Sequence, residues 1–470
     1  MFKKILIANR GEIALRILRA CHDLGIQGVV AYSEADRESL PVQLADEAVC
    51  IGPGPASRSY NHIPAILSAA LATGCDAIHP GYGFLAENAT LAEVCREVNV
   101  TFIGPEPETI RQMGDKATAR SVAQSSGVPV LPGSDDLQAS NFNLRDLTRQ
   151  VGFPMMLKAA AGGGGRGMRI ARDERELMRL MPLAQAEAQA AFSDGSIYVE
   201  RFLERPRHIE VQILGDRHGN VRSLGERDCS VQRRHQKLVE EAPAPGISRR
   251  LRDSLAKDAV KLAREIEYVG AGTFEFLVDE DDKHYFIEAN TRIQVEHPVT
   301  ELVTDLDLVT WQIRIAAGAA IDFDQKNVSI RGHAIECRVN AENPQEDFRP
   351  VAGLVDGYLA PGGPGIRVDS HLYPGYQIPT NYDSLLAKVI AWGPTRDIAI
   401  ARLERSLAEM LITGVDTTIP FLQRVLRSKD FRSGEVSTRL VGELQDGSRG
   451  SVAGPTSTGL APANDGSAAV

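Results

Sequence analysis

The sequence predicts a multidomain protein of the α/β and α+β classes that begins with a doubly wound parallel sheet. Strand and helix patterns alternate from residue 4 to residue 103, and this order is typical of parallel sheets. The chain has 470 residues, more than one hydrophobic core usually accommodates, so we expect roughly three domains. After Gly332 the pattern changes to alternating strands and one helix, which indicates a smaller α+β domain.

Composition excludes several classes of protein. Hydrophobic residues make up 43% and charged residues 24% of the chain, which is ordinary for a globular protein. The net charge of −10 provides no broad basic surface, and no apolar run is long enough for a signal peptide or a membrane span. The six cysteines form no CxxC pair, so neither a disulfide framework nor a structural zinc site is indicated. We expect a cytoplasmic protein that binds neither nucleic acid nor membranes.

The N-terminal elements follow one another in the order that a doubly wound sheet requires. Periodicity predicts strands at 4–8, 28–32, 76–79 and 101–103 and helices at 13–24, 63–72 and 91–98. No G-x-G-x-x-G fingerprint follows the first strand, so dinucleotide binding has little support. The segment HPGYGF at 79–84 follows a strand end, where such sheets bind ligands, but a plain Gly-Pro turn explains it equally well.

A glycine-rich segment follows the predicted strand at 154–158. Five of the six residues at 162–167 are glycine, and the strand before them ends in Lys158. Bare backbone N–H groups can cradle phosphates, with the lysine supplying a cation, although the G-K-[ST] of a P-loop is missing. A flexible linker is the alternative. Because the run lies between a strand and residues 168–170, as at a hairpin tip, the position favours a mobile lid.

A hairpin at 273–290 carries the strongest candidate for a metal site. Its strands alternate polar and apolar residues around a polar turn at 280–283. A turn centred on Asp281-Asp282 would place Glu275 opposite Glu288, with Asn290 on the same face. Two carboxylates and an amide oxygen suit Mg²⁺ or Mn²⁺ held jointly with phosphates. A solvated strand face is the alternative, but the polar run that follows at 292–297 favours a site.

The segment between the lid and this hairpin is rich in cations. The strand predicted at 207–214 places Ile209 on one face and His208, Glu210 and Gln212 on the other. Four of the five residues at 233–237 are basic or histidine, which indicates an anion site or, alternatively, a basic surface loop. We expect a rigid extended connector at 240–246 and an amphipathic helix at 254–265.

The last part of the chain contains weaker signals. Alternation predicts strands at 334–339, 354–359 and 385–390, and helical spacing predicts a helix at 396–411. From Gln445 onward the chain is mostly Gly, Ser, Ala, Pro and Thr without apolar periodicity, which predicts disorder.

Several of these motifs, taken together and in this order, resemble the biotin carboxylase family, the ATP-grasp component of biotin-dependent carboxylases. They are Lys116, Lys158, the glycine run with Arg166-Gly167-Met168, and the segments 226–230, 233–237, 240–246 and 288–300. The resemblance covers about residues 3–440. It implies an N-terminal domain at 1–113, an ATP-grasp domain at 114–330 with its lid at about 131–203, a C-terminal domain at 331–445 and a disordered tail at 446–470. It also implies a homodimer.

The resemblance implies a role for individual side chains. Around the nucleotide it assigns phosphate contacts to Lys116 and Lys158, the lid to Gly163, Gly164, Gly165 and Met168, adenine contacts to Glu200 and Leu203, and ribose and phosphate contacts to His208, Gln232 and His235. It assigns metal binding to Glu275, Glu288 and Asn290, and bicarbonate binding to Lys237, Arg292, Gln294 and Val295. It makes Glu296 the base, places Arg338 on the biotin ureido oxygen, and lets Tyr82 and Gly83 border the biotin.

The reaction that the resemblance implies is the ATP-dependent, ADP-forming carboxylation of biotin. ATP would activate bicarbonate as carboxyphosphate with Mg²⁺ or Mn²⁺, and the CO₂ released would react with biotin on a biotin carboxyl carrier protein. We expect a separate subunit that works with carboxyltransferase subunits, with acetyl-CoA carboxylase, and thus fatty acid biosynthesis, as the first choice. A propionyl-CoA, other acyl-CoA or pyruvate carboxylase is the alternative. More distant alternatives are another ATP-grasp ligase and a regulatory subunit without turnover.

Overall fold

The computed structural model describes residues 1–134, 144–159, 168–192 and 195–447. A parallel sheet of strand order β3-β2-β1-β4-β5 forms the N-terminal lobe. Its strands are β1 (Lys4–Ile7), β2 (Gln27–Ser33), β3 (Glu47–Gly52), β4 (Ala77–His79) and β5 (Thr101–Phe102). Its helices are α1 (Gly11–Asp23), α2 (Leu40–Leu44), α3 (Ile63–Ala72), α4 (Ala89–Glu97) and α5 (Pro107–Gly114). The doubly wound prediction is confirmed. Strand β3 was not predicted because it is an edge strand with mixed burial and no clear alternation.

The three-stranded sheet β7-β6-β8 forms a second, smaller layer. Its elements are β6 (Met155–Ala159), β7 (Arg169–Ala171), β8 (Ile197–Arg201), α7 (Leu144–Val151) and α8 (Glu174–Phe192), which share one apolar cluster. Strands β6 and β7 are antiparallel, with Leu157 opposite Arg169, so the glycine run connects the two strands of a hairpin as predicted. Gly163, Gly164 and Gly165 themselves lie outside the described residues, as does the tail beyond Gly447.

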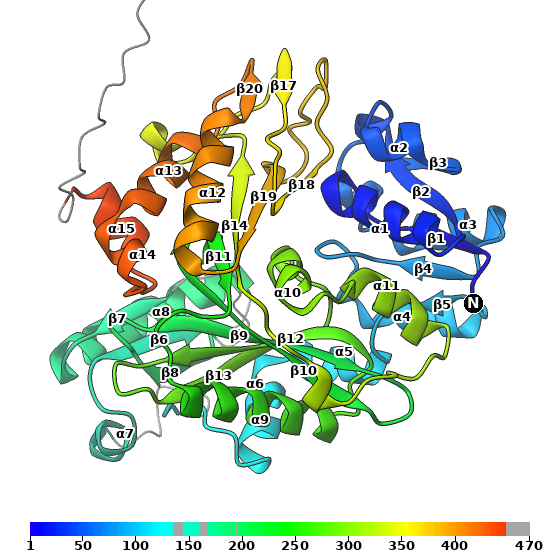
Figure 1. The fold of residues 1–470 in the computed structure, drawn as a ribbon. Helices are drawn as coiled ribbons and strands as arrows, with labels where there is room; N and C mark the ends of the chain where they lie inside the picture. The colour runs from blue at the N-terminus through cyan, green and yellow to red at the C-terminus, as the bar shows by residue number, and fades with distance from the viewer. Residues whose placement is uncertain (135–143, 160–167, 193–194, 448–470) are drawn as a thin grey trace, which may run out of the picture.

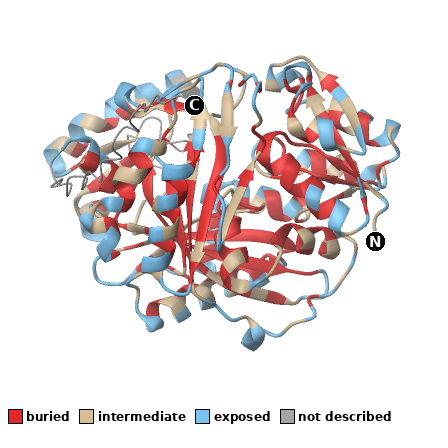
Figure 2. Cartoon of the chain, turned by 45° about the horizontal axis from the view of Figure 1, so that its top comes forward, coloured by how far each residue is buried: buried red, intermediate tan, exposed pale blue. Residues whose placement is uncertain are grey.

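An eight-stranded antiparallel sheet of order β13-β12-β9-β10-β11-β14-β19-β18 is the centre of the molecule (Figure 1). Figure 2 shows that the middle of this sheet is buried, whereas the outer strands β13 and β18 contain many half-buried residues. The strands are β9 (Arg207–Gly215), β10 (Val221–Arg233), β11 (Gln236–Ala242), β12 (Gly270–Val278), β13 (His284–Asn290), β14 (His333–Asn340), β18 (Ile366–Ser370) and β19 (Leu385–Gly393). Helices α6 (Lys116–Ser125) and α9 (Arg249–Glu265) cover one face through Ile209, Val211 and Ile213. The opposite face of β9 presents His208, Glu210 and Gln212 toward the site.

The structure specifies one expectation for the middle of the chain and corrects another. The basic segment at 233–237, expected as an anion site or a basic surface loop, forms the tip of the β10–β11 hairpin, and its turn residues Arg234 and His235 have φ values of 48° and 68°. The expected connector at 240–246 begins inside β11, where Glu240 and Glu241 are buried, and leaves the sheet only after Ala242. Both segments therefore extend the central sheet further than their composition indicated.

The three longest strands of the C-terminal region do not form a sheet of their own. Strands β14, β19 and β18 extend the central sheet, because β11 pairs with β14 along Val239–Ala242. Helices α12 (Arg396–Glu409), α13 (Ile419–Arg427), α14 (Lys429–Ser433) and α15 (Leu440–Gln445) share one apolar cluster with these strands. The strand predicted at 354–359 is limited to β17 (Gly357–Leu359), which pairs with β20 (Leu411–Thr413), and a short ladder joins β15 (Glu342–Asn343) to β16 (Arg349–Pro350).

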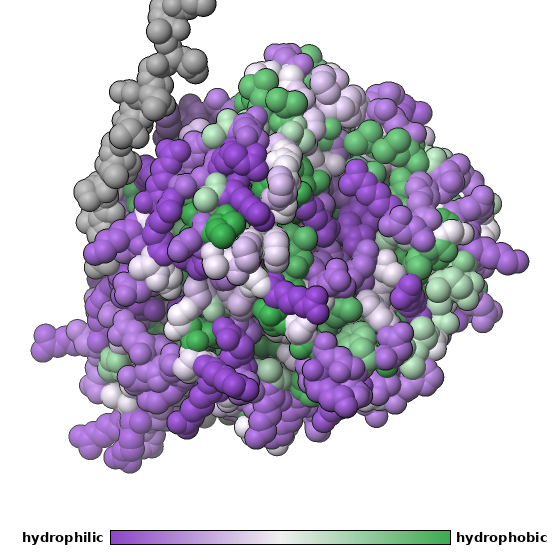
Figure 3. All heavy atoms as spheres, viewed as in Figure 1, coloured by the Kyte–Doolittle hydropathy of each residue, from purple (hydrophilic) through white to green (hydrophobic). Residues whose placement is uncertain are grey.

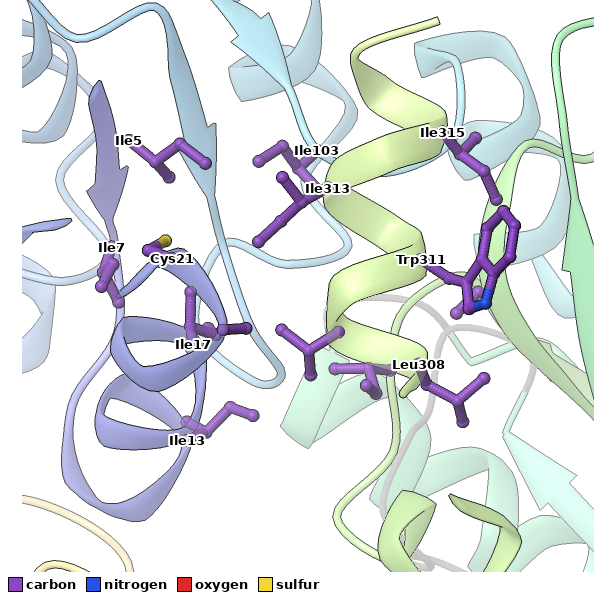
Figure 4. Packing of buried hydrophobic residues seen from close by; sticks show 14 of the residues in the cluster. Ile5, Ile7, Ile13, Ile17, Cys21, Ile103, Leu308, Trp311, Ile313 and Ile315 are labelled. Carbon is purple, nitrogen blue, oxygen red and sulfur yellow. The ribbon is translucent and has the colours of Figure 1, made fainter. Parts of the chain in front are cut away.

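Helices α10 (His297–Thr304) and α11 (Leu308–Ala316) connect the N-terminal lobe to the central sheet. Ile13 and Ile17 of α1 pack against Leu308 and Ile313 of α11 in a continuous apolar cluster (Figure 4). On the outside, hydrophilic residues cover most of the face in Figure 3. Among the described residues, no helix combines the length and the apolar character that a membrane span needs.

Candidate active site

Adjacent strands of the central sheet bring acids and cations together on one face. Glu210 on β9 lies opposite Arg227 on β10 and Glu275 on β12 in the strand register. Glu275 in turn lies opposite Glu288 on β13, as the hairpin pattern predicted. Side chains on one face of directly paired residues lie about 5 Å apart. The register alone therefore concentrates charge here, and the site needs cations to be stable.

Lys237 lies at the centre of this cluster. Its Nζ is 2.6 Å from Glu210 Oε2, 3.0 Å from Glu275 Oε1 and 2.7 Å from Glu296 Oε1. Burial alone would lower the pKa of Lys237, but the three carboxylates together raise it well above its usual value. Lys237 is therefore charged at neutral pH and holds acids from three different chain segments at one point.

Arg227 is a second cation of this cluster, and its side chain is fully buried. Its guanidinium donates to the Glu210 carboxylate, to Gln212 Oε1 at 2.7 Å, to Thr300 Oγ1 at 2.9 Å and to Thr273 Oγ1 at 3.0 Å. Because all three guanidinium nitrogens are engaged, Arg227 is fixed and holds the Glu210 carboxylate beside Lys237. Strand alternation indicated that Glu210 shares a polar face with His208, but no local pattern revealed its pairing with Arg227.

Glu296 joins Lys237 to Arg338. Its Oε2 accepts from Arg338 Nη2 at 2.7 Å, and Arg338 Nε donates to Glu240 Oε1 at 2.6 Å. Burial alone would raise the pKa of Glu296, but Lys237, Arg338 and Arg227 hold it well below its usual range. Glu296 is thus a carboxylate, the form that a proton acceptor requires. Glu240, the second acid on Arg338, was not singled out from the sequence.

The predicted metal ligands are close together, and the Glu275 carboxylate accepts several hydrogen bonds. Its Oε1 accepts from Asn290 Nδ2 at 2.8 Å and from Gln294 Nε2 at 3.0 Å, and its Oε2 lies 2.7 Å from His208 Nε2. Glu288 differs, because no described side chain bonds to its carboxylate. Burial and the neighbouring charge of Glu275 raise its pKa. An uncompensated carboxylate facing another acid fits a site for a divalent cation.

Two other groups of potential ligands are not metal sites in this arrangement. Ligand atoms of His208, Glu210 and Glu275, and likewise of Glu210, Cys229 and Glu296, lie within 4.8 Å of one another. Lys237 Nζ bonds to the carboxylates of both groups, so its ammonium group occupies the position that an ion would take. Burial also raises the pKa of Cys229 well above its usual value, which makes its thiol a poor ligand.

The residues expected at the nucleotide gather at the edge of the three-stranded sheet. Lys158 Nζ lies 2.5 Å from Glu200 Oε2, and Arg120 Nη1 lies 3.1 Å from Glu200 Oε1. His235 is close enough to Lys158 that burial and this charge lower its pKa. The other residues expected at the nucleotide come from separate elements: Lys116 begins α6, Gln232 is buried near the end of β10, Leu203 follows β8 and Met168 precedes β7.

The loop before α10 is tied to the N-terminal lobe through Glu87, which the sequence did not reveal. Glu87 accepts from the Thr291 N–H at 3.0 Å and from Arg292 Nε at 3.1 Å. Arg292 also donates to Gln294 Oε1 at 2.9 Å and to Asn290 Oδ1 at 3.2 Å. These contacts hold the Arg292 guanidinium beside the carboxylate cluster.

A cavity of about 320 Å³ lies beside this loop, where the N-terminal lobe meets the C-terminal region. Tyr82 and Gly83 line it together with Asn9, Arg10, Gly11, Glu12, Phe84, Asn381, Tyr382, Asp383 and Leu385. The last three residues of the HPGYGF segment, 82–84, therefore border a hollow. Tyr82 is fixed there, because its hydroxyl donates to Glu12 Oε1.

A central antiparallel sheet with this acid and cation cluster, beside a smaller β-sheet that presents Lys158, defines an enzyme of the ATP-grasp class. Comparison with protein families gives three matches along the chain. These are "Biotin carboxylase, N-terminal domain" at 1–110, "Carbamoyl-phosphate synthase L chain, ATP binding domain" at 115–323 and "Biotin carboxylase C-terminal domain" at 336–443. The chain belongs to the biotin carboxylase family.

Individual relatives agree with this assignment. The chain is 56% identical to the biotin carboxylase of Nostoc sp. over 94% of its own length and 99% of the relative, and 52% identical to biotin carboxylase 1 of Bacillus subtilis over 94% and 98%. It is also 51% identical to a pyruvate carboxylase subunit of Methanothermobacter thermautotrophicus over 95% and 91%. The family resemblance and the ATP-dependent ligase class predicted from the sequence are confirmed.

Solved structures show the same fold. The Campylobacter jejuni biotin carboxylase, solved as a βγ-ATP complex, matches with a TM-score of 0.89 and 46% identity, over 94% of this chain and 99% of that one. The biotin carboxylase domain dimer of the Hydrogenobacter thermophilus 2-oxoglutarate carboxylase was solved with MgADP and bicarbonate. It matches with a TM-score of 0.89 and 49% identity, over 94% and 98%.

Proposed function

We propose that this chain carboxylates biotin on a carrier protein, using ATP and bicarbonate, in the first half-reaction of an acetyl-CoA carboxylase. The observation that carries the reaction is the contact of Glu296 with both Lys237 and Arg338. One carboxylate thereby joins the cation expected at bicarbonate to the cation expected at biotin. This is the geometry that two consecutive steps at one point, bicarbonate activation and biotin carboxylation, require.

At the phosphate end, Lys116 and Lys158 neutralise the nucleotide. Glu200 now holds Lys158, so phosphate binding exchanges one anionic partner of this lysine for another. Glu275, Glu288 and Asn290 hold Mg²⁺ or Mn²⁺, which supplies charge neutralisation on the transferred phosphoryl group. The Glu288 carboxylate, to which no described side chain bonds, supports this assignment, since a bound dication would remove its repulsion with Glu275.

At the bicarbonate end, the loop before α10 supplies donors. Arg292, Gln294 and Lys237 face one another across the cluster, and a guanidinium can hold a planar anion with two parallel bonds. The Val295 carbonyl is already taken by Lys388 Nζ at 2.9 Å, while its N–H is used by no group among the described residues. Glu296 accepts the bicarbonate proton, so that the oxyanion can attack the γ-phosphoryl group and form carboxyphosphate.

At the biotin end, Arg338 stabilises the enolate-like ureido oxygen that forms when biotin loses a proton to the released phosphate. Burial would lower its pKa, but Glu240 and Glu296 raise it above the usual value, so the guanidinium remains a cation. Tyr82 and Gly83 border the biotin ring in the cavity between the N-terminal lobe and the C-terminal region.

The single test of the reaction is ATP cleavage by the purified chain. Cleavage should depend on bicarbonate, rise when free biotin is added, and yield carboxybiotin. ATP turnover that ignores both bicarbonate and biotin would overturn the assignment.

The acyl partner needs a second experiment. Stand-alone biotin carboxylases among the relatives support acetyl-CoA carboxylase, whereas the 2-oxoglutarate carboxylase domain and the pyruvate carboxylase subunit represent the alternatives. Capture of the native carrier and carboxyltransferase subunits, followed by assay with each acyl-CoA and keto acid, decides between them. A homodimer in the cytoplasm is part of the same proposal, and sedimentation of the purified chain tests the dimer.

A further inference from the structure

Lys388 on β19 is a fully buried cation outside the machinery described so far. The strand register places it opposite Arg338 on β14 and Asp369 on β18. Its Nζ lies 3.0 Å from Glu12 Oε1 and 2.9 Å from the Val295 carbonyl oxygen. We propose that Lys388 is a positioning residue. It fixes the biotin rim, by which we mean Tyr82 and Gly83, relative to the loop that carries Glu296. This inference rests on the proposed function.

At the biotin rim, Lys388 acts through Glu12. Glu12 Oε1 accepts from both Lys388 Nζ and the Tyr82 hydroxyl, whereas Glu12 Oε2 has no partner among the described residues. Lys388 is the only cation in the described chain that pairs with Glu12. The orientation of Tyr82 toward the cavity therefore depends on one oxygen atom that Lys388 holds in place.

At the bicarbonate loop, Lys388 acts through the peptide between Val295 and Glu296. The carbonyl that it binds belongs to this peptide, and Glu296 directly precedes α10. A fixed carbonyl fixes the plane of this peptide, which restrains the N–H of Glu296 and the starting direction of the Glu296 side chain. One ammonium group thus restrains a residue of the bicarbonate-activation step, Glu296, and a residue of the biotin-carboxylation step, Tyr82.

The surroundings keep Lys388 charged. Burial alone would lower its pKa, but Glu12, Glu336 and Asp369 raise it above the usual value. Asp369 Oδ2 is 3.8 Å away and is shared with Arg367, and both oxygens of buried Glu336 lack a hydrogen-bond partner in the described chain. The ammonium group is therefore a cation at neutral pH and available as a donor to Glu12 and Val295.

The simpler explanation is that Lys388 is only a counterion that stabilises the contact between α1 and the sheet. The two explanations differ in what the loss of Lys388 does to the coupling between ATP cleavage and biotin carboxylation. A counterion affects only the amount of folded enzyme, so its loss lowers the rates of both steps by the same factor. A positioning residue changes the KM for biotin and the yield of carboxybiotin per ATP cleaved.

The experiment compares Lys388→Met with Lys388→Arg, which restores charge and donors. Arg396→Met is the matched control, because Arg396 is a poorly exposed cation that pairs with Glu241 and contacts neither Tyr82 nor Val295. For Lys388→Met we expect the KM for free biotin to rise about tenfold and carboxybiotin per ATP to fall several-fold, since a charge-assisted hydrogen bond is lost at each end. Lys388→Arg should partly restore both the biotin KM and the yield of carboxybiotin per ATP. Arg396→Met should change neither quantity.

A double-mutant cycle with Tyr82→Phe shows whether the effect passes through Glu12. The combined variant should lose less than the product of the two single effects on the biotin KM. If Lys388→Met does not fold, Glu12→Gln keeps the shape and should raise the biotin KM while leaving the bicarbonate KM unchanged. A wild-type biotin KM and yield in Lys388→Met, or in Glu12→Gln if that variant is needed, overturns the inference, as does full multiplicativity in the cycle. Absence of bicarbonate-dependent cleavage in the wild type instead overturns the proposed function.

Discussion

Replacement of Glu296 by glutamine separates the role of a base from that of a ligand. The amide keeps the size of the side chain but cannot take up a proton, so bicarbonate activation should slow by about 10²–10⁴-fold, the usual contribution of a general base. The fold should survive, because Lys237 keeps Glu210 and Glu275 as partners and Arg338 keeps Glu240. Two charge-assisted hydrogen bonds weaken, at a cost of about 1.5–3 kcal/mol each.

The assay measures bicarbonate-dependent ATP cleavage together with calorimetric binding of ATP and Mg²⁺. The affinities for ATP and Mg²⁺ should stay within about threefold of the wild type. Glu296 contacts none of the residues expected at the phosphates, and only Lys237 links it to the metal site. Glu240→Gln is the matched control: it neutralises the other acid on Arg338 but leaves the base intact. Parallel loss of ATP binding, metal binding and turnover in Glu296→Gln would show that Glu296 is a ligand, and equal loss of cleavage in both variants would refute the assignment of the base.

The remaining predictions concern single groups. Arg338→Ala should retain bicarbonate-dependent ATP cleavage within about threefold while biotin carboxylation falls about 10²-fold; equal losses in the two rates would contradict it. Glu288→Gln removes the charge facing Glu275, so the Mg²⁺ concentration for half-maximal activity should rise about tenfold or more while the melting temperature holds, and unchanged activity at limiting Mg²⁺ would count against a metal role. Burial and Glu296 raise the pKa of Glu240 to about 7 against the opposing effect of Arg338, so the folded state retains a proton that the unfolded state loses. The free energy of unfolding should therefore fall from about pH 5 to about pH 8 by more in the wild type than in Glu240→Gln, as urea titrations at each pH would show; parallel curves would rule this out. Truncation after Gln445 should change the melting temperature by less than about 2 °C, because the last buried helix ends there, and a larger drop would mean that the tail packs on the domain.

The site could be predicted from the sequence where its geometry is local. Glu275 and Glu288 belong to one hairpin, and its polar turn and its alternation together determine which residues face each other. The N-terminal strands and helices were found for the same reason, since each buries one face with its own period. The motif order then supplied the family, and with it residues such as Arg338 that no local pattern marks.

The rest of the site depends on pairings between distant segments. Glu87 reaches the Arg292 loop from the N-terminal lobe, and Lys388 reaches Glu12 from the far end of the chain. A buried lysine inside the apolar strand at 385–393 has no sequence signal, because its partners are visible only in three dimensions. The continuation of the central sheet into β14 was missed for the same reason: the alternation at 334–339 predicts a strand but not its neighbour.

The shared sheet limits how this protein can be divided. A fragment that stopped near residue 330 would leave β11 as an open edge, with the N–H and C=O groups of Val239–Ala242 unpaired along a strand that is buried in the whole protein. Such edges recruit strands from other molecules, so the fragment should aggregate rather than persist as a free nucleotide-binding domain. The C-terminal piece alone would carry the complementary edge of β14. The two parts therefore fold as one unit, and separating them would require a new strand or a charged edge at β11.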